Sequence, residues 1–479
     1  MIDQATRAKY RVTIGIECHV QLKTKTKLFS AVGNDAREAP PNTLVSHIDF
    51  GLPGALPVLN EAALELASRA AFALKSQPQK FSKFDRKHYF YPDLPMGYQI
   101  TQFDEPIVLG GQVTIDVNGE SKTVGITRAH LEADAGKNTH AAGTDYSLVD
   151  LNRAGTPLLE IVSEPDMHSS AEAKAYAREL YLLMRYADVS DANLYYGNMR
   201  FDVNVSISQT DELGTRTETK NLNSFRSVEK AVEFEVERQI EQLEKGERIV
   251  QETRGWNDAK QKTFSQRSKE NADDYRYMPD PDLPPVVLAD DYIEKIKSAM
   301  PALPDDYRQK FQAINIDAKV IEDILADPES ARLVERILAD SGAEHARRVA
   351  FWMMLADEEE SAESERQSVT DEQLIKLSQL VADNKLSSTA AKDVLAELFK
   401  NGGDPEQVAT KKNLLQVSDE GAIAKIVEQV LADNPQAATD VRNGEMKAIG
   451  FLVGQVMKAS QGKANPSLAQ ELIKKQLAE

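Results

Sequence analysis

The sequence predicts an α+β protein in which a mixed N-terminal domain with a polar-faced sheet precedes two all-helical domains. Residues 1–290 contain short runs of alternating apolar and polar residues, separated by Gly, Pro, Asn and Asp. A segment with four prolines, 278–285, follows and predicts a break in regular structure. From about residue 291, apolar residues recur with helical spacing almost to the end of the chain.

A second break at residues 401–405 (NGGDP) divides the helical part. We therefore expect a mixed domain at 1–291, a helical domain at 292–404 and a helical tail at 405–479. In the mixed domain the pattern predicts helices at 61–74, 170–186 and 227–243, and strands at 112–117, 125–134, 199–208 and 215–220. Asn118-Gly119 predicts a hairpin, and the irregular order of helices and strands favours α+β over a βαβ arrangement.

Composition limits the class of protein. The chain has 479 residues, one cysteine and a net charge of −19. No apolar run approaches the roughly 20 residues of a membrane helix, and the N-terminus has no signal-peptide pattern. We therefore expect a cytoplasmic protein with no membrane segment and no internal disulfide. A chain this acidic does not bind nucleic acid over its general surface, so any such contact requires a local basic patch.

The stretch 14–22 predicts a strand with one apolar and one polar side. Glu17 and His19 stand on the polar side, and Cys18 lies on the apolar side. Three further strands repeat this alternation, with polar sides consisting of Arg128, His130, Glu132 and Asp134, then Arg200, Asp202, Asn204 and Ser206, then Arg216, Glu218 and Lys220. Converging carboxylates with an imidazole suit Mg²⁺ or Mn²⁺. The alternative is a solvated sheet face crossed by ion pairs.

A loop at 84–100 combines Arg86 and Lys87 with several tyrosines and turn-forming residues. Such a loop can bind phosphates and bases, or it can anchor the core by packing its aromatic rings. The segment 273–279 has a similar composition and could close over the same cavity. The chain has no P-loop, no Rossmann fingerprint, no zinc spacing and no nucleophile elbow.

Long segments around these residues resemble one known family. The matching segments are 14–22, 84–102, 125–137, 147–165, 220–225, 273–279 and 450–466, and together they extend across essentially the whole chain. The family is the B subunit of the aspartyl/glutamyl-tRNA(Asn/Gln) amidotransferase, GatB/GatE. Its implied fold is a mixed cradle domain, a helical domain and a mobile helical tail that grips the tRNA.

The resemblance implies an activity and partners. In this family the B subunit recognises misacylated Glu-tRNA(Gln), and often Asp-tRNA(Asn), and phosphorylates the side-chain carboxylate with ATP and Mg²⁺. The A subunit hydrolyses glutamine, and its ammonia converts the acyl phosphate into the amide. A small C subunit is the third member of the heterotrimer. Two alternatives remain open: a non-catalytic tRNA-binding and assembly subunit with a degraded kinase site, and a metal-dependent phosphoryl-transfer enzyme acting on a small acid.

The resemblance also implies roles for individual residues. The expected metal ligands are His19, Glu132, Glu218 and Asp202, with Glu17 beside them, and the expected catalytic residues are Lys87, Arg86 and Glu132. Substrate and ATP are expected to contact Tyr89, Tyr91, Tyr98, Arg128, Arg153, Arg200 and Lys220. Local positive charge for tRNA is expected from Lys458, Lys463, Lys474 and Lys475. Tyr196 stands where the family has an acid, which implies a changed metal shell, weaker kinase activity or a neutral substitution.

Overall fold

The computed structural model divides the chain into two compact units, 1–304 and 305–479. It describes residues 2–140, 143–268, 275–358, 369–416, 420–443, 445, 447–460 and 464–478. Within these described residues the strands lie in the first unit, and the regular elements of the second are helices. The predicted α+β class is thereby confirmed, while the finer boundaries at 291 and 404 stay a prediction.

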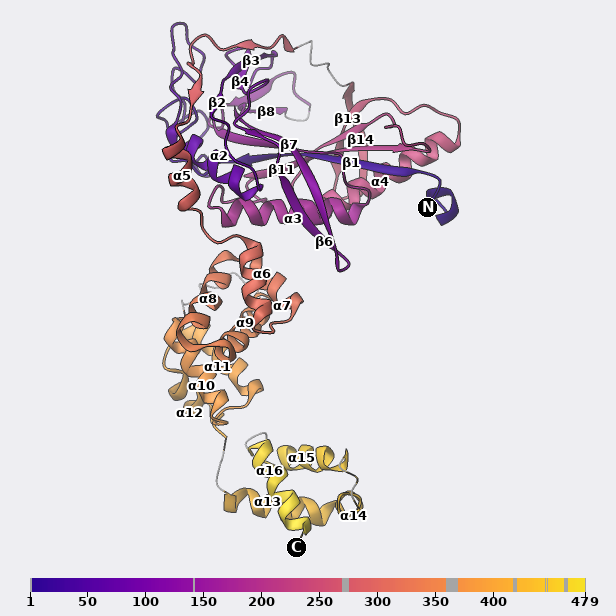
Figure 1. Ribbon diagram of the computed structural model, residues 1–479, viewed down its shortest axis with the longest axis vertical. Helices are drawn as coiled ribbons and strands as arrows, with labels where there is room; N and C mark the ends of the chain where they lie inside the picture. The colour runs from indigo at the N-terminus through magenta and orange to yellow at the C-terminus, as the bar shows by residue number, and fades with distance from the viewer. Residues whose placement is uncertain are drawn as a thin grey trace. The chain divides into compact units, whose positions relative to one another are not determined.

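A twelve-stranded sheet forms the centre of the first unit (Figure 1). Its main path runs β14-β13-β12-β11-β1-β10-β7-β4-β3-β15, and β5 and β6 also pair with β7. Only the β12–β13 pair of this sheet is parallel among the described residues. In path order the strands are Lys262–Ser268, Glu252–Asn257, Thr217–Leu222, Met199–Ser208, Arg11–Gln21, Pro157–Ser163, Glu120–Ala133, Tyr98–Thr101, Asp85–His88 and Met278–Pro279, with β5 at Val108–Leu109 and β6 at Gln112–Val117.

Two small two-stranded sheets complete the strands of this unit. They pair β16 (Val286–Val287) with β2 (Phe81–Ser82), and β8 (Lys137–His140) with β9 (Ser147–Asp150). The hairpin between β6 and β7 turns at Asn118 and Gly119, whose φ angles of 56° and 84° suit the predicted two-residue turn. The last strand of the large sheet corrects one expectation, because β15 includes Pro279. A proline is tolerated there since β15 is an edge strand that pairs only with β3.

Helices cover the apolar face of the large sheet. Helices α3 (Ser170–Tyr186) and α4 (Phe225–Glu244) pack on each other, and α4 packs on β11; both run along one side of the sheet in Figure 1. A serine precedes each helix, Ser169 or Ser224, and its side chain accepts a hydrogen bond from the backbone N–H three residues on. The short α1 (Gln4–Arg7), α2 (Glu61–Ala73) and α5 (Asp290–Ser298) complete the helices of this unit. The three helices predicted here are confirmed to within a few residues.

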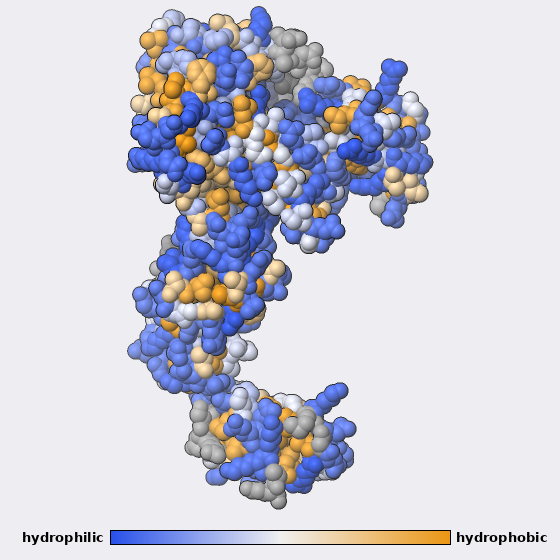
Figure 2. Space-filling model, in the orientation of Figure 1, coloured by the Kyte–Doolittle hydropathy of each residue, from blue (hydrophilic) through white to orange (hydrophobic). Residues whose placement is uncertain are grey.

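The second unit is helical throughout its regular elements. In order, α6 to α16 are Pro304–Ala313, Ala318–Leu325, Pro328–Ser341, Ala343–Glu358, Asp371–Ala382, Ser388–Asn401, Pro405–Lys411, Glu420–Asp433, Pro435–Arg442, Lys447–Ala459 and Pro466–Ala478. The last four helices share a core that includes Val427, Leu452 and Ile473. Among the described residues, none of the helices is both long and apolar enough to cross a bilayer. The face shown in Figure 2 is mostly hydrophilic, with small hydrophobic patches.

Candidate functional site

The central strand β1 is flanked by β10 and β11, and its alternate side chains point to opposite faces of the sheet. Ile14, Ile16 and Cys18 face the core and are at most 1% exposed. On the other face, Glu17 is paired with Asp202 across the ladder, and His19 is paired with Glu160. Paired residues share a face, so three neighbouring strands present polar side chains to one side.

Two histidines and two glutamates meet on this polar face and form what we call the His–Glu cluster: His19, His130, Glu132 and Glu160. His19 Nε2 lies 3.5 Å from Glu132 Oε1 and 3.7 Å from Glu160 Oε2. His130 Nε2 lies 3.2 Å from Glu160 Oε2 and 3.9 Å from Glu132 Oε2. None of the four side chains is more than 20% exposed. The cluster therefore concentrates two carboxylates in a nearly buried place.

The donors of the His–Glu cluster fit a divalent cation. One ligand atom each from His19, Glu132 and Glu160 lies within 4.8 Å of the other two. His130 Nδ1 is buried without a hydrogen-bond partner in the described part of the chain. Two close carboxylates repel each other unless positive charge or a proton offsets them. The three atoms that come together are two carboxylate oxygens and one imidazole nitrogen, donors that Mg²⁺ or Mn²⁺ can take.

Glu160 is the carboxylate of the His–Glu cluster that its neighbours keep ionised. Burial alone would raise the pKa of Glu160, but His130, His19 and Lys87 outweigh burial and hold this pKa well below its ordinary value. Glu17 behaves in the opposite way, because burial and the neighbouring Glu160 raise its pKa. Its Oε1 accepts a hydrogen bond of 3.1 Å from Asn204 Nδ2. Glu17 therefore lies beside the cluster, and its supporting role stays a prediction.

Two other expected ligands, Asp202 and Glu218, are held by a lysine. Lys220 Nζ lies 2.7 Å from Asp202 Oδ2 and 3.2 Å from Glu218 Oε1. Burial opposes ionisation of Asp202, yet Lys220 and His19 lower its pKa overall. Burial likewise opposes the charge on Lys220, yet the two carboxylates raise its pKa. These three residues share the polar face with the His–Glu cluster, and the lysine offsets part of the negative charge of the two carboxylates.

Lys87 is the cation that faces the His–Glu cluster from β3. Burial would lower its pKa, but Glu132, Tyr277 and Glu160 raise it overall, so the ammonium stays charged. Its Nζ lies 4.8 Å from the ring centre of Tyr275, which favours the charged form through a cation–π contact. Lys87 therefore meets the electrostatic requirement for a group that steadies anionic oxygens.

Arg86 and Tyr98 lie on the opposite face of β3 and β4 from Lys87. Arg86 Nε lies 3.0 Å from Asp280 Oδ2, and its Nη2 lies 2.9 Å from Asp282 Oδ2. The guanidinium carbon stands 4.3 Å from the ring centre of Tyr98. The structure therefore does not bring these two expected site residues to the His–Glu cluster. Arg86 instead joins β3 to the proline-rich segment, and the Tyr98 ring packs against its guanidinium.

Aromatic rings gather beside Lys87. Tyr89 makes edge contacts with Tyr91 and Tyr275, at ring-centre distances of 6.0 and 6.2 Å. Phe103 and Tyr277 stack at 3.9 Å, and Arg128 Nη1 donates a hydrogen bond of 2.9 Å to the Phe103 carbonyl. These contacts bring together the two aromatic segments of similar composition, as the sequence predicted. The expected substrate-binding roles of Tyr89, Tyr91 and Arg128 stay predictions.

Asp134 forms ion pairs with Arg153 and Arg200, the two remaining arginines that were expected to bind substrate. Arg153 Nε lies 3.1 Å from Asp134 Oδ2, and Arg200 Nη2 lies 3.3 Å from the same oxygen. Arg153 also donates to the carbonyls of Ala135 and Gly136. Because Arg200 is paired with His19 across the β1–β11 ladder, this group of charges borders the His–Glu cluster.

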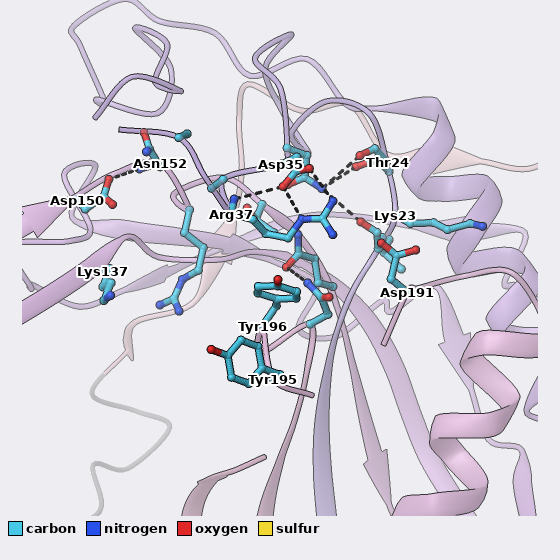
Figure 3. A pocket seen from close by; sticks show the side chains of 18 residues that line it. Lys23, Thr24, Asp35, Arg37, Lys137, Asp150, Asn152, Asp191, Tyr195 and Tyr196 are labelled. Atoms are coloured by element: carbon cyan, nitrogen blue, oxygen red, sulfur yellow. Dashed lines mark hydrogen bonds and ion pairs between the residues drawn. The ribbon is translucent and has the colours of Figure 1, made fainter. Parts of the chain in front are cut away.

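A cavity of about 700 Å³ opens where β1 ends, and we call it the β1 cavity (Figure 3). Its lining includes Gln21, two residues beyond His19, and Arg153. Tyr195 and Tyr196 also line it, and their rings lie 5.2 Å apart. The Arg37 guanidinium lies 5.7 Å from the ring centre of Tyr196. Tyr196 therefore belongs to this cavity, and its ring contacts there are with Arg37 and Tyr195, outside the His–Glu cluster.

Three of the four lysines expected to bind tRNA are described. Lys458 is exposed near the end of α15, and Lys474 and Lys475 are exposed on α16. Lys463 lies outside the described residues. All three side chains are accessible to a polyanion, and their role stays a prediction.

Sequence reasoning missed Glu160 as a site residue and did not single out His130 as one. Glu160 is the one charged residue in the apolar run Pro157–Ser163. A lone carboxylate between apolar neighbours could have indicated a site residue, since a buried carboxylate without a partner costs free energy. His130 stood in the same alternating strand as Glu132, but choosing it required the distance to Glu160.

Two domain families match this chain. The GatB/GatE catalytic domain matches residues 12–294, and the GatB domain matches residues 333–477. The first match covers more than half of the chain and contains every residue of the His–Glu cluster. The chain belongs to the GatB/GatE family. The resemblance found in the sequence is thereby confirmed.

Full-length relatives of this GatB/GatE chain carry one common name, the B subunit of the aspartyl/glutamyl-tRNA(Asn/Gln) amidotransferase. The relative from Trichodesmium erythraeum is 44% identical over 494 residues, which cover 98% of both chains. That from Thermoanaerobacter pseudethanolicus is 44% identical and covers 98% of this chain and 100% of the relative. That from Halorhodospira halophila is 47% identical over 480 residues, which cover 98% of this chain and 99% of the relative. The GatB/GatE likeness therefore extends over both units.

Proposed function

We propose that this protein is the B subunit of a glutamine-hydrolysing, tRNA-dependent amidotransferase. It binds Glu-tRNA(Gln), Asp-tRNA(Asn) or both, and phosphorylates the side-chain carboxylate of the attached amino acid. An A subunit releases ammonia from glutamine, and a small C subunit is the third member of the heterotrimer. Membership of the GatB/GatE family over nearly the full length supports this function.

The observation that carries the proposal is the His–Glu cluster with Lys87 facing it. A carboxylate is a poor acylating group, and phosphorylation turns one of its oxygens into a leaving group. Mg²⁺ or Mn²⁺, held by His19, Glu132 and Glu160, would offset the negative charge of ATP phosphates and of the substrate carboxylate. A sheet face with two carboxylates and a half-buried, charged lysine suits this chemistry better than a purely structural role.

The residues around the cluster have separate tasks in this proposal. Lys87 holds the phosphoryl oxygens, because its ammonium stays charged beside Glu132 and Glu160. Lys220 offsets part of the negative charge of Asp202 and Glu218, which lessens their repulsion of an incoming anion. The rings beside Lys87 exclude water, which strengthens these charge contacts and protects an acyl phosphate from hydrolysis.

The second unit is proposed to hold the body of the tRNA. Its exposed lysines on α15 and α16 give local positive charge to a chain whose net charge is −19. Such contacts neutralise phosphates and do not select a sequence. They therefore explain how an acidic protein binds a polyanion.

The test is a complete reaction with the purified amidotransferase complex. Glu-tRNA(Gln), glutamine and labelled ATP are supplied, and ADP and Gln-tRNA are measured together. We expect ADP formation that depends on the misacylated tRNA and stops when the divalent metal is removed with EDTA. Binding of tRNA without ADP formation would instead support a non-catalytic assembly subunit. Turnover with free glutamate in place of Glu-tRNA would support a small-acid enzyme.

A further inference from the structure

Tyr195 and Tyr196 are aromatic side chains at the β1 cavity whose exposure calls for an explanation. Tyr195 is 88% exposed and Tyr196 is 53% exposed, although both line a concave surface. Large aromatic rings contribute most when they are buried, so two adjacent exposed rings at a cavity mark a surface that a partner covers. Figure 3 shows Tyr196 between Arg37 and Tyr195, and Lys137 belongs to the same lining.

Arg37, whose guanidinium lies beside the Tyr196 ring, is paired with a neighbouring carboxylate. Arg37 Nε and Nη2 donate to the two oxygens of Asp35, at 2.8 and 2.6 Å. This pairing lowers the pKa of Asp35 to about 2, and it holds the guanidinium against the Tyr196 ring. A preset arrangement costs little conformational entropy when a ligand binds.

The turn that carries the tyrosines is also tied to the strand of the His–Glu cluster. Asn198 Nδ2 donates to Gln21 Oε1 at 3.0 Å, and Gln21 N donates to the Asn198 carbonyl at 2.7 Å. Gly197 has φ of 71°, a conformation that glycine adopts without strain. Gln21 follows His19 by two residues, or about 7 Å along a strand. The turn of Tyr195 and Tyr196 is thus tied to a residue that stands one strand repeat from a candidate metal ligand.

We propose that Tyr195 and Tyr196 stack on a nucleobase at the unpaired 3′ end of the tRNA, and so position the attached amino acid for the His–Glu cluster. This inference rests on the proposed function. The amino acid is esterified to the terminal nucleotide, so the base and the reacting carboxylate must bind at neighbouring sites. Single-stranded bases stack on aromatic rings without a strict sequence requirement. Lys137 is exposed on the cavity lining and forms no ion pair within the described residues, which leaves it available to a phosphate.

An adenine of ATP is the other nucleobase that could reach these rings. The exposure of Tyr195 favours the tRNA end, because a base entering from solvent as part of a polymer meets the outermost ring first. Tyr196 also stands where the family resemblance has an acid. A ring at this position adds stacking surface without removing a member of the His–Glu cluster.

The experiment uses the full amidotransferase complex and tRNA with 2-aminopurine as its 3′-terminal base. Stacking quenches the fluorescence of 2-aminopurine. The variants are Tyr195→Ala, Tyr196→Ala and the ring-keeping Tyr196→Phe, with Phe264→Ala as the matched control. Phe264 is 48% exposed on β14 and does not line the β1 cavity. The KM for Glu-tRNA and for ATP is measured for each variant.

We expect each Ala variant to raise the KM for Glu-tRNA by roughly fivefold to a hundredfold, the range that follows from losing one stacked base. Quenching falls in the Ala variants and persists in Tyr196→Phe and Phe264→Ala, and the KM for ATP stays unchanged. Unchanged quenching, a higher KM for ATP, or failure of the Ala variants to assemble with the other subunits each overturns the inference. Absence of tRNA-dependent turnover in the unmodified complex refutes the proposed function itself, and so is distinguished from these outcomes.

Discussion

Replacing Glu160 by glutamine should remove the divalent metal from the His–Glu cluster. The pKa of Glu160 is held well below its ordinary value, so the side chain is a full anion at neutral pH. Glutamine keeps its size and one acceptor oxygen but loses the charge that lies 3.2 Å from His130 and 3.7 Å from His19. Losing even an outer partner of a metal ligand lowers metal affinity about 10- to 100-fold. For a direct ligand we expect at least about 100-fold, or roughly 2.7 kcal/mol.

The assay follows ADP formation by the complex with Glu-tRNA and glutamine while the Mg²⁺ concentration is varied. We expect the Mg²⁺ requirement of Glu160→Gln to rise by that factor, with thermal unfolding and tRNA binding close to the unmodified protein. Glu164→Gln is the matched control, because its Oε1 accepts a hydrogen bond from Thr127 and the residue lies just beyond β10. An unshifted Mg²⁺ dependence in Glu160→Gln would show that Glu160 is not a ligand.

Three further predictions concern other parts of the chain. Lys87→Met should lower the turnover of ATP about 100-fold or more, because it removes the ammonium that faces the cluster. The affinity for tRNA should stay unchanged, and single-turnover kinetics measure the chemical step separately from tRNA binding. Glu235→Gln should lower the free energy of unfolding by about 2–4 kcal/mol, measured by urea denaturation, since the fully buried carboxylate lies 2.7 Å from Arg238 and 2.9 Å from Arg254. These arginines outweigh burial and lower the pKa of Glu235 below 4.5. The difference in the free energy of unfolding between the unmodified protein and Glu235→Gln should therefore be complete above pH 4.5, and it should vanish as pH falls through the lowered pKa. Replacing Lys458, Lys474 and Lys475 by alanine should reduce the slope of log affinity for tRNA against log salt concentration by up to about 3. Filter binding at several salt concentrations measures this slope.

The polar face could be predicted from the sequence because a strand alternates with a fixed period. Apolar residues every second position along β1 require the intervening Glu17 and His19 to face the other side. The same reasoning places Glu132 on the corresponding face of β7, and the structure brings it within 3.5 Å of His19. Alternation also separates Arg86 from Lys87, since neighbours on a strand face opposite ways. The prediction of a loop at 84–100 missed this separation, because Asp85–His88 is a strand.

Cross-strand contacts could not be predicted, because they depend on register and bulges. The register shifts between Phe201 and Val203 where β11 pairs with β12. This irregularity sets which residues on β12 lie opposite Asp202, and thus its pairing with Lys220. The sequence shows the same charged residues on each strand whether Asp202 binds a metal or pairs with a lysine. Only the three-dimensional register distinguishes these two cases.

The His–Glu cluster lies on strands that are rigidly held in the middle of the large sheet. Carboxylates held close together repel one another, so the backbone that carries them must resist separation. β1, β10 and β7 are adjacent interior strands, each hydrogen-bonded on both sides. Their opposite face is packed with fully buried residues such as Ile14, Ala129 and Ile161. The free energy of core packing therefore holds these side chains in place, as preorganisation of the proposed phosphoryl-transfer site requires.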